Sequence, residues 1–408
     1  MNKEKMMQIL QDTAYVRLTG TDAVLKAAKY IQAQCAEMGL NATLEPFAVA
    51  LAKIKKAQLF ADGIELPCKG YFLAGSGQVE APLYYLRSME DCNLAKCKGK
   101  IVLVDCYMDY WCYHDLLENG AVGFITYDGN PYYKDADIDQ RELRPFVSGG
   151  VKIPGVHVNA RTAVELARMG EPTVKIVLEQ DEFMGEAHNV VLDMPGETDE
   201  YIVLSAHYDS IAISVGVYDN MSGAVGLLAM AEYFSKHPHR YGLRFVWTGA
   251  EEQGENGSKA YCAAHADELS KFVLNINLDM IGCIMGKFIS CVTAEEKLCN
   301  YISYFASEVG FGIEVKQDVY SSDSTPFADK GIPAVSFARI APQNTATIHN
   351  SYDTPAVMKG EQMVRDVEFL IGFVKRMANA KHCPVAREMP ENMKEKLDIY
   401  LCRKRAPK

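Results

Sequence analysis

The sequence predicts an α/β protein that carries a mainly β domain as an insert. From Ala187 onward, long apolar strands alternate with helices, which is typical of a sheet with helices on both faces. Between Leu51 and Asp181, short strands are instead broken by glycine, proline and aspartate. The length of 408 residues is about twice what one ordinary domain needs. We therefore expect one large domain from residues 1–50 and 186–382, an insert at 51–185, and a helix with a tail at 383–408.

The composition is that of an ordinary globular protein, with 49% apolar and 23% charged residues. The net charge of −11 argues against a nucleic-acid partner, which would need a basic face. No apolar run approaches the roughly 18 residues that cross a bilayer, and the first residues do not resemble a signal peptide. Twelve cysteines without a CxxC pair favour buried, reduced thiols. We therefore expect a cytoplasmic protein without a membrane partner; its oligomeric state stays open.

The first half of the chain predicts one amphipathic helix followed by short strands. Residues 24–38 place apolar side chains at three- and four-residue steps, and Gly39 follows as a helix stop. The run NATLEPFAVA then predicts a strand. In the insert, KGKIVLVDC and TVKIVLEQ predict strands, HDLLENGAVGFITYDG predicts a helix and then a strand, and KIPGVHVNARTAVELARMG predicts a strand and then a helix.

The second half predicts longer strands. NVVLDMPG and EYIVLSAHYDS predict a hairpin around Pro195–Glu200, and residues 222–237 predict a helix with Ser222 as its N-cap. Further strands are predicted in LRFVWTGAEE, KFVLNINLDMIG, KFISCV and PAVSFARI. The polar residues 388–408 predict a peripheral helix and a solvated tail.

Distinctive acids and histidines fall at the ends of the predicted strands, which is the edge where α/β sheets bind ligands. His207 and Asp209 follow one strand. Residues two apart on a strand share a face, so Asp209 can accept the proton of one imidazole nitrogen while the other nitrogen binds a metal. Asp219 lies just before a predicted helix, whose N-terminus favours a carboxylate.

Three more positions complete this set. Glu251 and Glu252 follow another strand, where one acid can reach a metal while its neighbour acts as a base. Asp279 ends the next strand, and His349 follows later in the chain. Any one of these residues alone is more often a polar surface residue. Together, two histidines and three carboxylates, with Glu251 left over, predict a mixed nitrogen and oxygen site of the kind that zinc accepts.

The motifs AHYDS, YDNMSG, GAEEQG, NLDMIG and HNSYDT resemble, in order and type, those of the co-catalytic zinc peptidases of family M28. This resemblance spans residues 187–381 and implies a mixed-sheet zinc-exopeptidase domain. It implies two Zn²⁺ ions per chain, with Mn²⁺ or Co²⁺ as substitutes. By the resemblance, Asp219 bridges the ions, His207 and Asp279 complete one site, Glu252 and His349 complete the other, Glu251 is the general base, and Asp209 is the orienting carboxylate.

The resemblance also extends to the substrate side. SSDSTPF, with Asp323, resembles a family motif that lies near the substrate. Some relatives place a tyrosine before the last histidine as the oxyanion donor, whereas Ile348 here has no donor; Tyr320 and Tyr352 are the alternatives. Arg339, at a predicted strand end, is a candidate contact for a substrate carboxylate.

The insert resembles a protease-associated (PA) domain, which many members of the family carry at this point. We therefore predict an aminopeptidase that releases N-terminal residues from peptides with a free N-terminus, using water activated by two zinc ions. The alternatives are a metallocarboxypeptidase or a glutaminyl cyclase on the same fold, and a non-catalytic binding protein. The five ligand positions and the base are all retained, which favours the hydrolase.

Overall fold

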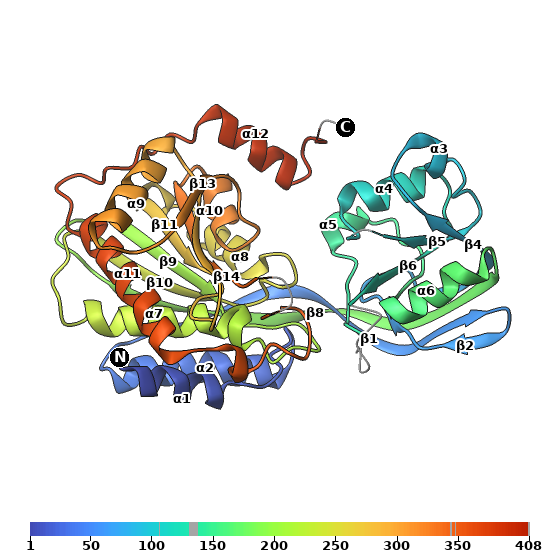
Figure 1. Cartoon of the computed structure of the whole chain (residues 1–408), viewed down its shortest axis with the longest axis horizontal. Helices are drawn as coiled ribbons and strands as arrows, with labels where there is room; N and C mark the ends of the chain where they lie inside the picture. Colours follow the sequence, from blue (N-terminus) through green and yellow to red (C-terminus); the bar gives the residue numbers. More distant parts are fainter. Residues whose placement is uncertain (106, 130–137, 343–344, 347, 407–408) are drawn as a thin grey trace. The chain divides into compact units, whose positions relative to one another are not determined.

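The computed structural model describes residues 1–105, 107–129, 138–342, 345–346 and 348–406. The chain divides into two compact units: unit 1 is Met1–Ala48 with Glu186–Lys408, and unit 2 is Val49–Gly185. Two strands continue from one unit into the other, β1 (Thr43–Ala61) and β8 (Thr173–Met194) (Figure 1). Both are longer than the strands predicted there. In β8 the first residues pair with a strand of unit 2 and the last residues pair with a strand of unit 1.

Unit 1 is built on a mixed sheet whose centre is parallel. The neighbouring strands β14, β11, β9 and β10 run parallel to one another. β12 lies antiparallel to β14 and parallel to β13, and the end of β8 lies antiparallel to β10. The bounds are β9 (Tyr201–His207), β10 (Gly242–Thr248), β11 (Phe272–Leu278), β12 (Lys287–Thr293), β13 (Glu314–Gln317) and β14 (Ala334–Ile340).

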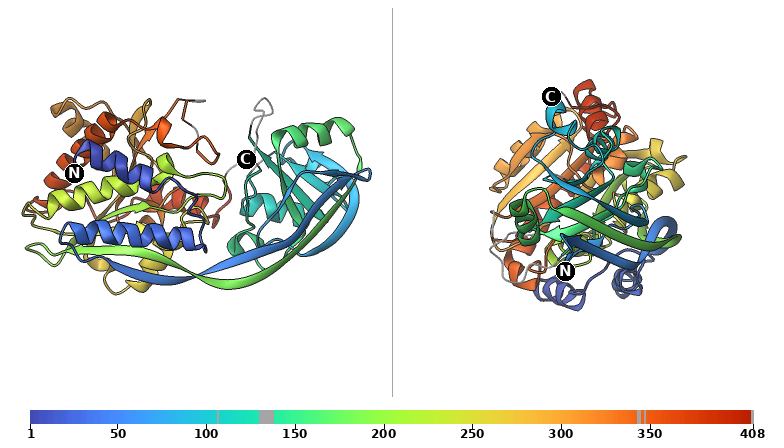
Figure 2. Two further views of the ribbon diagram at one scale, coloured as in Figure 1. Left: turned by 90° about the horizontal axis from the view of Figure 1, so that it is seen from below. Right: turned by 90° about the vertical axis from the view of Figure 1, so that its right-hand side faces the viewer.

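Helices cover both faces of this sheet, as predicted (Figures 1 and 2). Ile202 and Leu204 of β9 pack with one group of helices, whereas Val203, on the opposite face, packs with another. The first group is α1 (Lys3–Asp12), α2 (Asp22–Glu37), α7 (Ser222–Phe234), α9 (Glu296–Glu308) and α11 (Gly360–Ala378). The second is α8 (Asn256–Ala264) and α10 (Ser324–Asp329). Shorter helical turns are η1 (Val217–Met221), η2 (Leu269–Lys271) and η3 (Pro355–Val357).

Unit 2 contains a parallel run of four strands. β4 (Gly77–Leu86), β5 (Ile101–Val104), β6 (Gly123–Asp128) and β7 (Gly155–Asn159) are successive neighbours. β8 lies antiparallel to β4, β3 (Lys69–Gly70) lies antiparallel to β7, and β2 (Ile64–Leu66) pairs with β1. The helices are α3 (Asp91–Leu94), α4 (Tyr110–Glu118), α5 (Pro145–Ser148) and α6 (Ala160–Met169). Cys106, the last residue of the predicted strand KGKIVLVDC, lies outside the described residues.

Two expectations about local structure are wrong, and one helix was missed. The predicted hairpin does not form, because β10 lies between β8 and β9 in the sheet. Ser222 does not cap α7; its hydroxyl donates to Tyr218 O and accepts from the backbone of Ile281. Helix α1 was not predicted, although it buries Met6 and Ile9 in the core.

Helix α12 (Glu391–Tyr400) lies where a peripheral helix was predicted. Its residues Met393 and Leu397 are nevertheless buried. Among the helices that the structure describes, none combines the length and apolar character that spanning a bilayer requires.

Unit 2 contains a buried histidine that cannot easily be charged. His157, on β7, is 2% exposed, and its Nδ1 lies 2.7 Å from Thr126 Oγ1. Its Nε2 has no hydrogen-bond partner within the described part of the chain. Burial, with a smaller contribution from nearby Arg141, lowers the pKa of His157 to about 3. The imidazole is therefore neutral in the folded protein near neutral pH.

We expect His157 to make unit 2 less stable as the pH falls. The unfolded chain protonates this histidine below its ordinary pKa of about 6.5, whereas the folded chain does not, so stability is lost from about pH 7 downward. At pH 5 the loss is about 2 kcal/mol relative to neutral pH. Hydrogen exchange of β6 and β7, corrected for intrinsic rates, measures it. His157→Gln should remove this part of the pH dependence, whereas His237→Gln, at an exposed position, should not; equal pH slopes in all three proteins would contradict the prediction.

Candidate metal centre

Three adjacent parallel strands bring the predicted residues to one edge of the unit 1 sheet. In the strand register, Thr248 at the end of β10 lies opposite His207 at the end of β9. Asn277 of β11 pairs with Ser205, which brings Asp279 level with His207. Parallel strands end at the same edge, so the loops after them start side by side.

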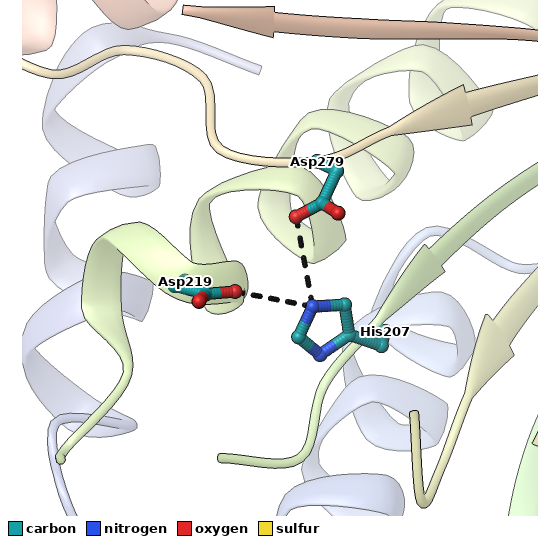
Figure 3. A group of neighbouring side chains, drawn as sticks. All are labelled: His207, Asp219 and Asp279. Carbon is teal, nitrogen blue, oxygen red and sulfur yellow. Dashed lines mark ion pairs between the residues drawn. The ribbon is translucent and has the colours of Figure 1, made fainter. Parts of the chain in front are cut away.

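One cluster of possible ligands consists of His207, Asp219 and Asp279 (Figure 3). His207 Nε2 lies 3.2 Å from Asp219 Oδ1 and 3.6 Å from Asp279 Oδ1. All three side chains are buried. In Figure 3 both carboxylates point toward the same imidazole nitrogen, from η1 and from the loop after β11.

The second cluster consists of Asp219, Glu252 and His349. His349 Nε2 lies 3.2 Å from Asp219 Oδ2 and 3.1 Å from Glu252 Oε2. Asp219 therefore directs one carboxylate oxygen toward each histidine. Burial alone would raise the pKa of Asp219, but the two imidazoles hold it below its ordinary value. The carboxylate is shared between the clusters.

The donor atoms of both clusters fit metal binding. Ligands bound at about 2.0–2.1 Å in a tetrahedron lie about 3.3 Å from one another. The distances from each histidine nitrogen to the carboxylate oxygens of its cluster run from 3.1 to 3.6 Å. Asp279 Oδ1 is buried and has no hydrogen-bond partner among the described residues. A bound cation would satisfy this oxygen.

The charge of the site also favours cations. The carboxylates of Asp219, Glu251, Glu252 and Asp279 gather around the two histidines, and none is more than 13% exposed. Buried charges are costly unless they are paired or coordinate a metal. Divalent ions would balance this concentration of negative charge.

Glu251 stands beside the first cluster without belonging to either. Its Oε2 lies 3.9 Å from His207 Nε2. Burial raises the pKa of its carboxyl well above the ordinary range, although His207 opposes the shift. A carboxylate with a raised pKa is a stronger base.

Asp209 holds the turn that carries both glutamates. Its two oxygens accept hydrogen bonds from the backbone N–H groups of Glu251 and Glu252, at 3.1 and 3.2 Å. The side chain is fully buried, and its Oδ1 lies 3.5 Å from His207 Nδ1. The structure thus places Asp209 behind His207, as predicted, and adds a contact with the glutamate turn that the sequence did not indicate.

Two residues to which the sequence analysis assigned no role hold the loop of Asp219. Asp353 accepts hydrogen bonds from the backbone N–H groups of Tyr218 and Asp219, at 2.7 and 3.0 Å. Asn220 accepts from the backbone of Met280 at 2.9 Å and donates to Leu278 O at 2.8 Å. Asn220 therefore ties the loop of Asp219 to the loop of Asp279. Asp353 stands in the quoted motif HNSYDT, but the motif alone does not show its partner.

Arg17 is a third residue that was not predicted. It is fully buried and donates to five backbone carbonyl groups, including Tyr208 O at 2.6 Å and Gly216 O at 2.7 Å. Burial lowers its pKa to about 10, while Asp209 and Asp353 oppose the shift. Arg17 thus fixes the chain between His207 and Asp219. In the sequence, Arg17 is a single basic residue between two helices, and no motif around it indicates this role.

Two of the predicted substrate contacts need correction. Arg339 makes a bidentate ion pair with Asp366, at 2.8 and 2.5 Å, and donates to Gly286 O, so it fastens β14 to α11 instead of facing a substrate. Asp323 is fully buried and accepts a hydrogen bond from Thr248 Oγ1 at 2.5 Å. Burial raises its pKa to about 7. Neither side chain is open to a ligand.

The alternative oxyanion donors differ in placement. Tyr320 packs against the core of unit 1. Burial raises the pKa of its phenol well above the ordinary value, and the charges of Asp279 and Asp219 raise this pKa further. Tyr352 is 50% exposed. Ile348 packs against the core and supplies no donor.

Two relatives of this chain are aminopeptidases by name. The chain is 27% identical over 357 residues to aminopeptidase YwaD of Bacillus subtilis, covering 83% of this chain and 75% of that protein. It is 26% identical over 295 residues to the probable lipoprotein aminopeptidase LpqL of Mycobacterium tuberculosis, covering 68% of this chain but only 57% of that protein.

Two solved structures share the fold. An aminopeptidase from Aneurinibacillus sp. strain AM-1 matches with a TM-score of 0.76 and 22% identity, over 94% of this chain and 96% of that one. BSAP, described as a zinc aminopeptidase from Bacillus subtilis, matches with a TM-score of 0.78 and 21% identity, over 95% and 99%.

Fold and site together define an α/β domain with a mixed sheet and two clusters of possible metal ligands around a shared aspartate. Residues 189–371 match the profile of Peptidase family M28. The chain therefore carries a peptidase family M28 domain. The match ends within α11 and does not include α12.

Asn220 provides a test of how the ligand loops are held. Asn220→Asp keeps the acceptor but replaces the amide that donates to Leu278 O with a carboxylate oxygen. We expect the free energy of unfolding of unit 1 to fall by about 1–3 kcal/mol, because two buried acceptors then face each other. Urea unfolding measures this loss. The matched control is Asn41→Asp, at an exposed position, and equal stability of the two variants would contradict the proposed tie.

Proposed function

We propose that this chain is a zinc-dependent aminopeptidase with two metal ions. The observation that carries the proposal is Asp219, whose two carboxylate oxygens face two different clusters while Glu251 stands beside them. The names of the relatives support the same activity: YwaD is an aminopeptidase, and BSAP is a zinc aminopeptidase.

The ligand assignment follows from the two clusters. His207 and Asp279 would hold one zinc ion, Glu252 and His349 would hold the other, and Asp219 would bridge them. When bound, the two ions supply Lewis acidity, which lowers the pKa of water and polarises a carbonyl group. The mixture of imidazole and carboxylate donors suits zinc, and it also accepts Mn²⁺ or Co²⁺.

Glu251 is proposed as the general base. It would take a proton from the attacking water at a carboxylate oxygen and return it to the leaving amine. Burial among other acids suits this task, since it raises the proton affinity of the carboxylate. Asp209 would act by orienting His207 and by fixing the backbone of the turn that carries Glu251.

Tyr320 is proposed as the donor to the oxyanion. It would take the place of the tyrosine that is missing at Ile348. Burial and the charges of Asp279 and Asp219 raise the pKa of its phenol, which favours the neutral form. A neutral phenol can donate a hydrogen bond to the negative charge that develops on the carbonyl oxygen.

The proposed substrates are peptides with a free N-terminus. The acidic residues around the clusters favour a ligand that brings positive charge, as an α-amino group does. Within the chain, we assign catalysis to the domain formed by residues 1–50 and 186–382. Residues 51–185 are proposed to form a PA-like insert without chemistry of its own.

Mass spectrometry of peptides tests the activity directly. We expect the zinc-loaded protein to remove N-terminal residues one at a time from unblocked peptides. A chelator or an acetylated N-terminus should stop the reaction. Glu251→Gln should retain zinc but lose at least about 10³-fold in kcat/KM, since only the base is removed.

The pattern of products separates this proposal from its alternatives. C-terminal trimming would indicate a carboxypeptidase, and loss of ammonia from an N-terminal glutamine would indicate a cyclase; either result overturns the proposal. Near-normal turnover by Glu251→Gln would overturn the assignment of the base. Glu65→Gln, at an exposed position in unit 2, is the matched control and should match the wild type.

Metal content tests the two-ion assignment. The wild-type chain should bind two zinc ions, measured by elemental analysis after dialysis against a defined free zinc concentration. His349→Ala removes a ligand of one cluster only, so we expect the content to fall from about two to about one. His239→Ala, outside both clusters, should leave it unchanged. A wild-type content of one ion, or an unchanged content in His349→Ala, would refute the assignment.

A further inference from the structure

Helix α12 packs on the segment that carries Tyr320. Met393 and Leu397 form a small buried cluster with Ala328 and Ala334, and Val319 packs against it. Residue 319 immediately precedes Tyr320. The apolar face of α12 therefore covers α10 and the start of β14 together with the loop in front of them.

Charged residues of this region tighten the contact at two points. Lys396 Nζ donates to Asp318 Oδ1 and to Gln317 O, both at 3.1 Å. Arg403, just after the helix, makes two hydrogen bonds to the carboxylate of Asp329, at 2.5 and 2.9 Å. A freely solvated tail would not make such a set of contacts.

The last residue of α12 connects two loops of the proposed active site. The hydroxyl of Tyr400 lies 2.7 Å from Glu255 Oε1 and 2.6 Å from Ser321 Oγ. A carboxylate only accepts hydrogen bonds, so the single phenol proton goes to Glu255. Ser321 must then donate to the phenol oxygen. The result is a chain of two hydrogen bonds from Ser321 through Tyr400 to Glu255.

Glu255 belongs to the turn that carries the proposed base. Its backbone N–H donates to Glu251 O at 2.7 Å. Its side chain is 6% exposed, and its backbone has a φ of 58°, in the left-handed region that a residue with a side chain rarely adopts. Such a conformation persists only where surrounding contacts impose it. The hydrogen bond from Tyr400 is one of those contacts.

We propose that Tyr400 is a positioning residue, which holds the turn of Glu251 and the loop of Tyr320 in one fixed arrangement. This inference rests on the proposed function, because it matters for catalysis only if Glu251 and Tyr320 act as assigned. Tyr400 acts through Glu255 and Ser321 and has no direct part in the reaction. Its phenol also lies in the field of Glu251, whose charge is among the lesser causes that raise the pKa of Tyr400, after burial and Glu255.

Tyr400→Phe tests the proposal by removing one hydroxyl and keeping the ring. We expect kcat to fall about tenfold with KM and zinc content nearly unchanged, because the loops lose their relative placement while the metal ligands stay. Hydrogen exchange should rise in the segments 250–256 and 319–323 and nowhere else. The control is Tyr304→Phe on α9, whose side chain is 78% exposed and which should behave as the wild type.

A double-mutant cycle tests the hydrogen-bonded chain itself. Ser321→Ala removes the donor to the phenol, so it should cause part of the loss that Tyr400→Phe causes. The double variant should be no slower than Tyr400→Phe alone, since both changes break the same connection. Independent, multiplying effects would show that the two residues act separately and would overturn the proposal.

The outcomes separate this inference from the function on which it rests. If the wild type removes N-terminal residues and Tyr400→Phe does so equally fast, the positioning role is wrong and the aminopeptidase stands. A parallel loss of zinc and thermal stability in Tyr400→Phe would show a merely structural role and would also overturn it. If the wild type is inactive, the proposed function fails. Hydrogen exchange then decides whether Tyr400 joins the two loops: raised exchange in both segments supports the connection, and unchanged exchange refutes it.

Discussion

The accumulation of carboxylates at one edge of an apolar sheet is the constraint on which the rest of unit 1 depends. Asp209, Asp219, Asp279 and Asp353 are all buried there. A carboxylate that leaves water must find hydrogen-bond donors or a cation, because the cost of burying an uncompensated charge is several times the stability of a typical contact. Backbone N–H groups supply such partners to Asp209 and Asp353, and the two histidines supply them to Asp219, whereas Asp279 Oδ1 has no hydrogen-bond partner among the described residues.

The partners divide these acids into two kinds. Asp209 and Asp353 each accept two hydrogen bonds from backbone N–H groups. Asp209 thereby fixes the loop that contains Glu251, and Asp353 fixes the loop that contains Asp219. Asp219 and Asp279 instead point toward His207. Oxygens that face an imidazole across 3.2–3.6 Å keep room for a cation between them, whereas oxygens that accept backbone hydrogens do not. Asp209 and Asp353 therefore hold the loops of the site, whereas Asp219 and Asp279 are available to bind a cation.

This division explains what could be predicted from the sequence. His207 and Asp279 were recognisable because parallel strands end at a common edge, so an acid or a histidine directly after an apolar strand has a predictable place. Arg17, Asp353 and Tyr400 were not, because their partners lie 199, 135 and 145 residues away in the chain. No local pattern records such contacts. The predicted hairpin was wrong for the same reason, since proximity in the chain does not reveal that β10 inserts between β8 and β9.

The loops themselves, more than the sheet, must determine how precisely the two clusters face each other. The candidate ligands Glu252, Asp279 and His349 lie on irregular backbone, which the hydrogen bonds of the sheet do not restrain. Hydrogen bonds join the loops in pairs instead. Asp209 joins the end of β9 to the turn of Glu251 and Glu252, and Asn220 joins the loop of Asp219 to the end of β11. Asp353 joins the segment that carries His349 to the loop of Asp219. Tyr400 adds the segment of Tyr320 to the same network. The joins made by Asn220 and Asp353 use buried hydrogen bonds, whereas those made by Asp209 and Tyr400 are partly or fully exposed. Breaking a buried one leaves an unpaired polar group. The geometry is therefore held collectively, and a residue as far along the chain as α12 belongs to the site as much as the strand ends do.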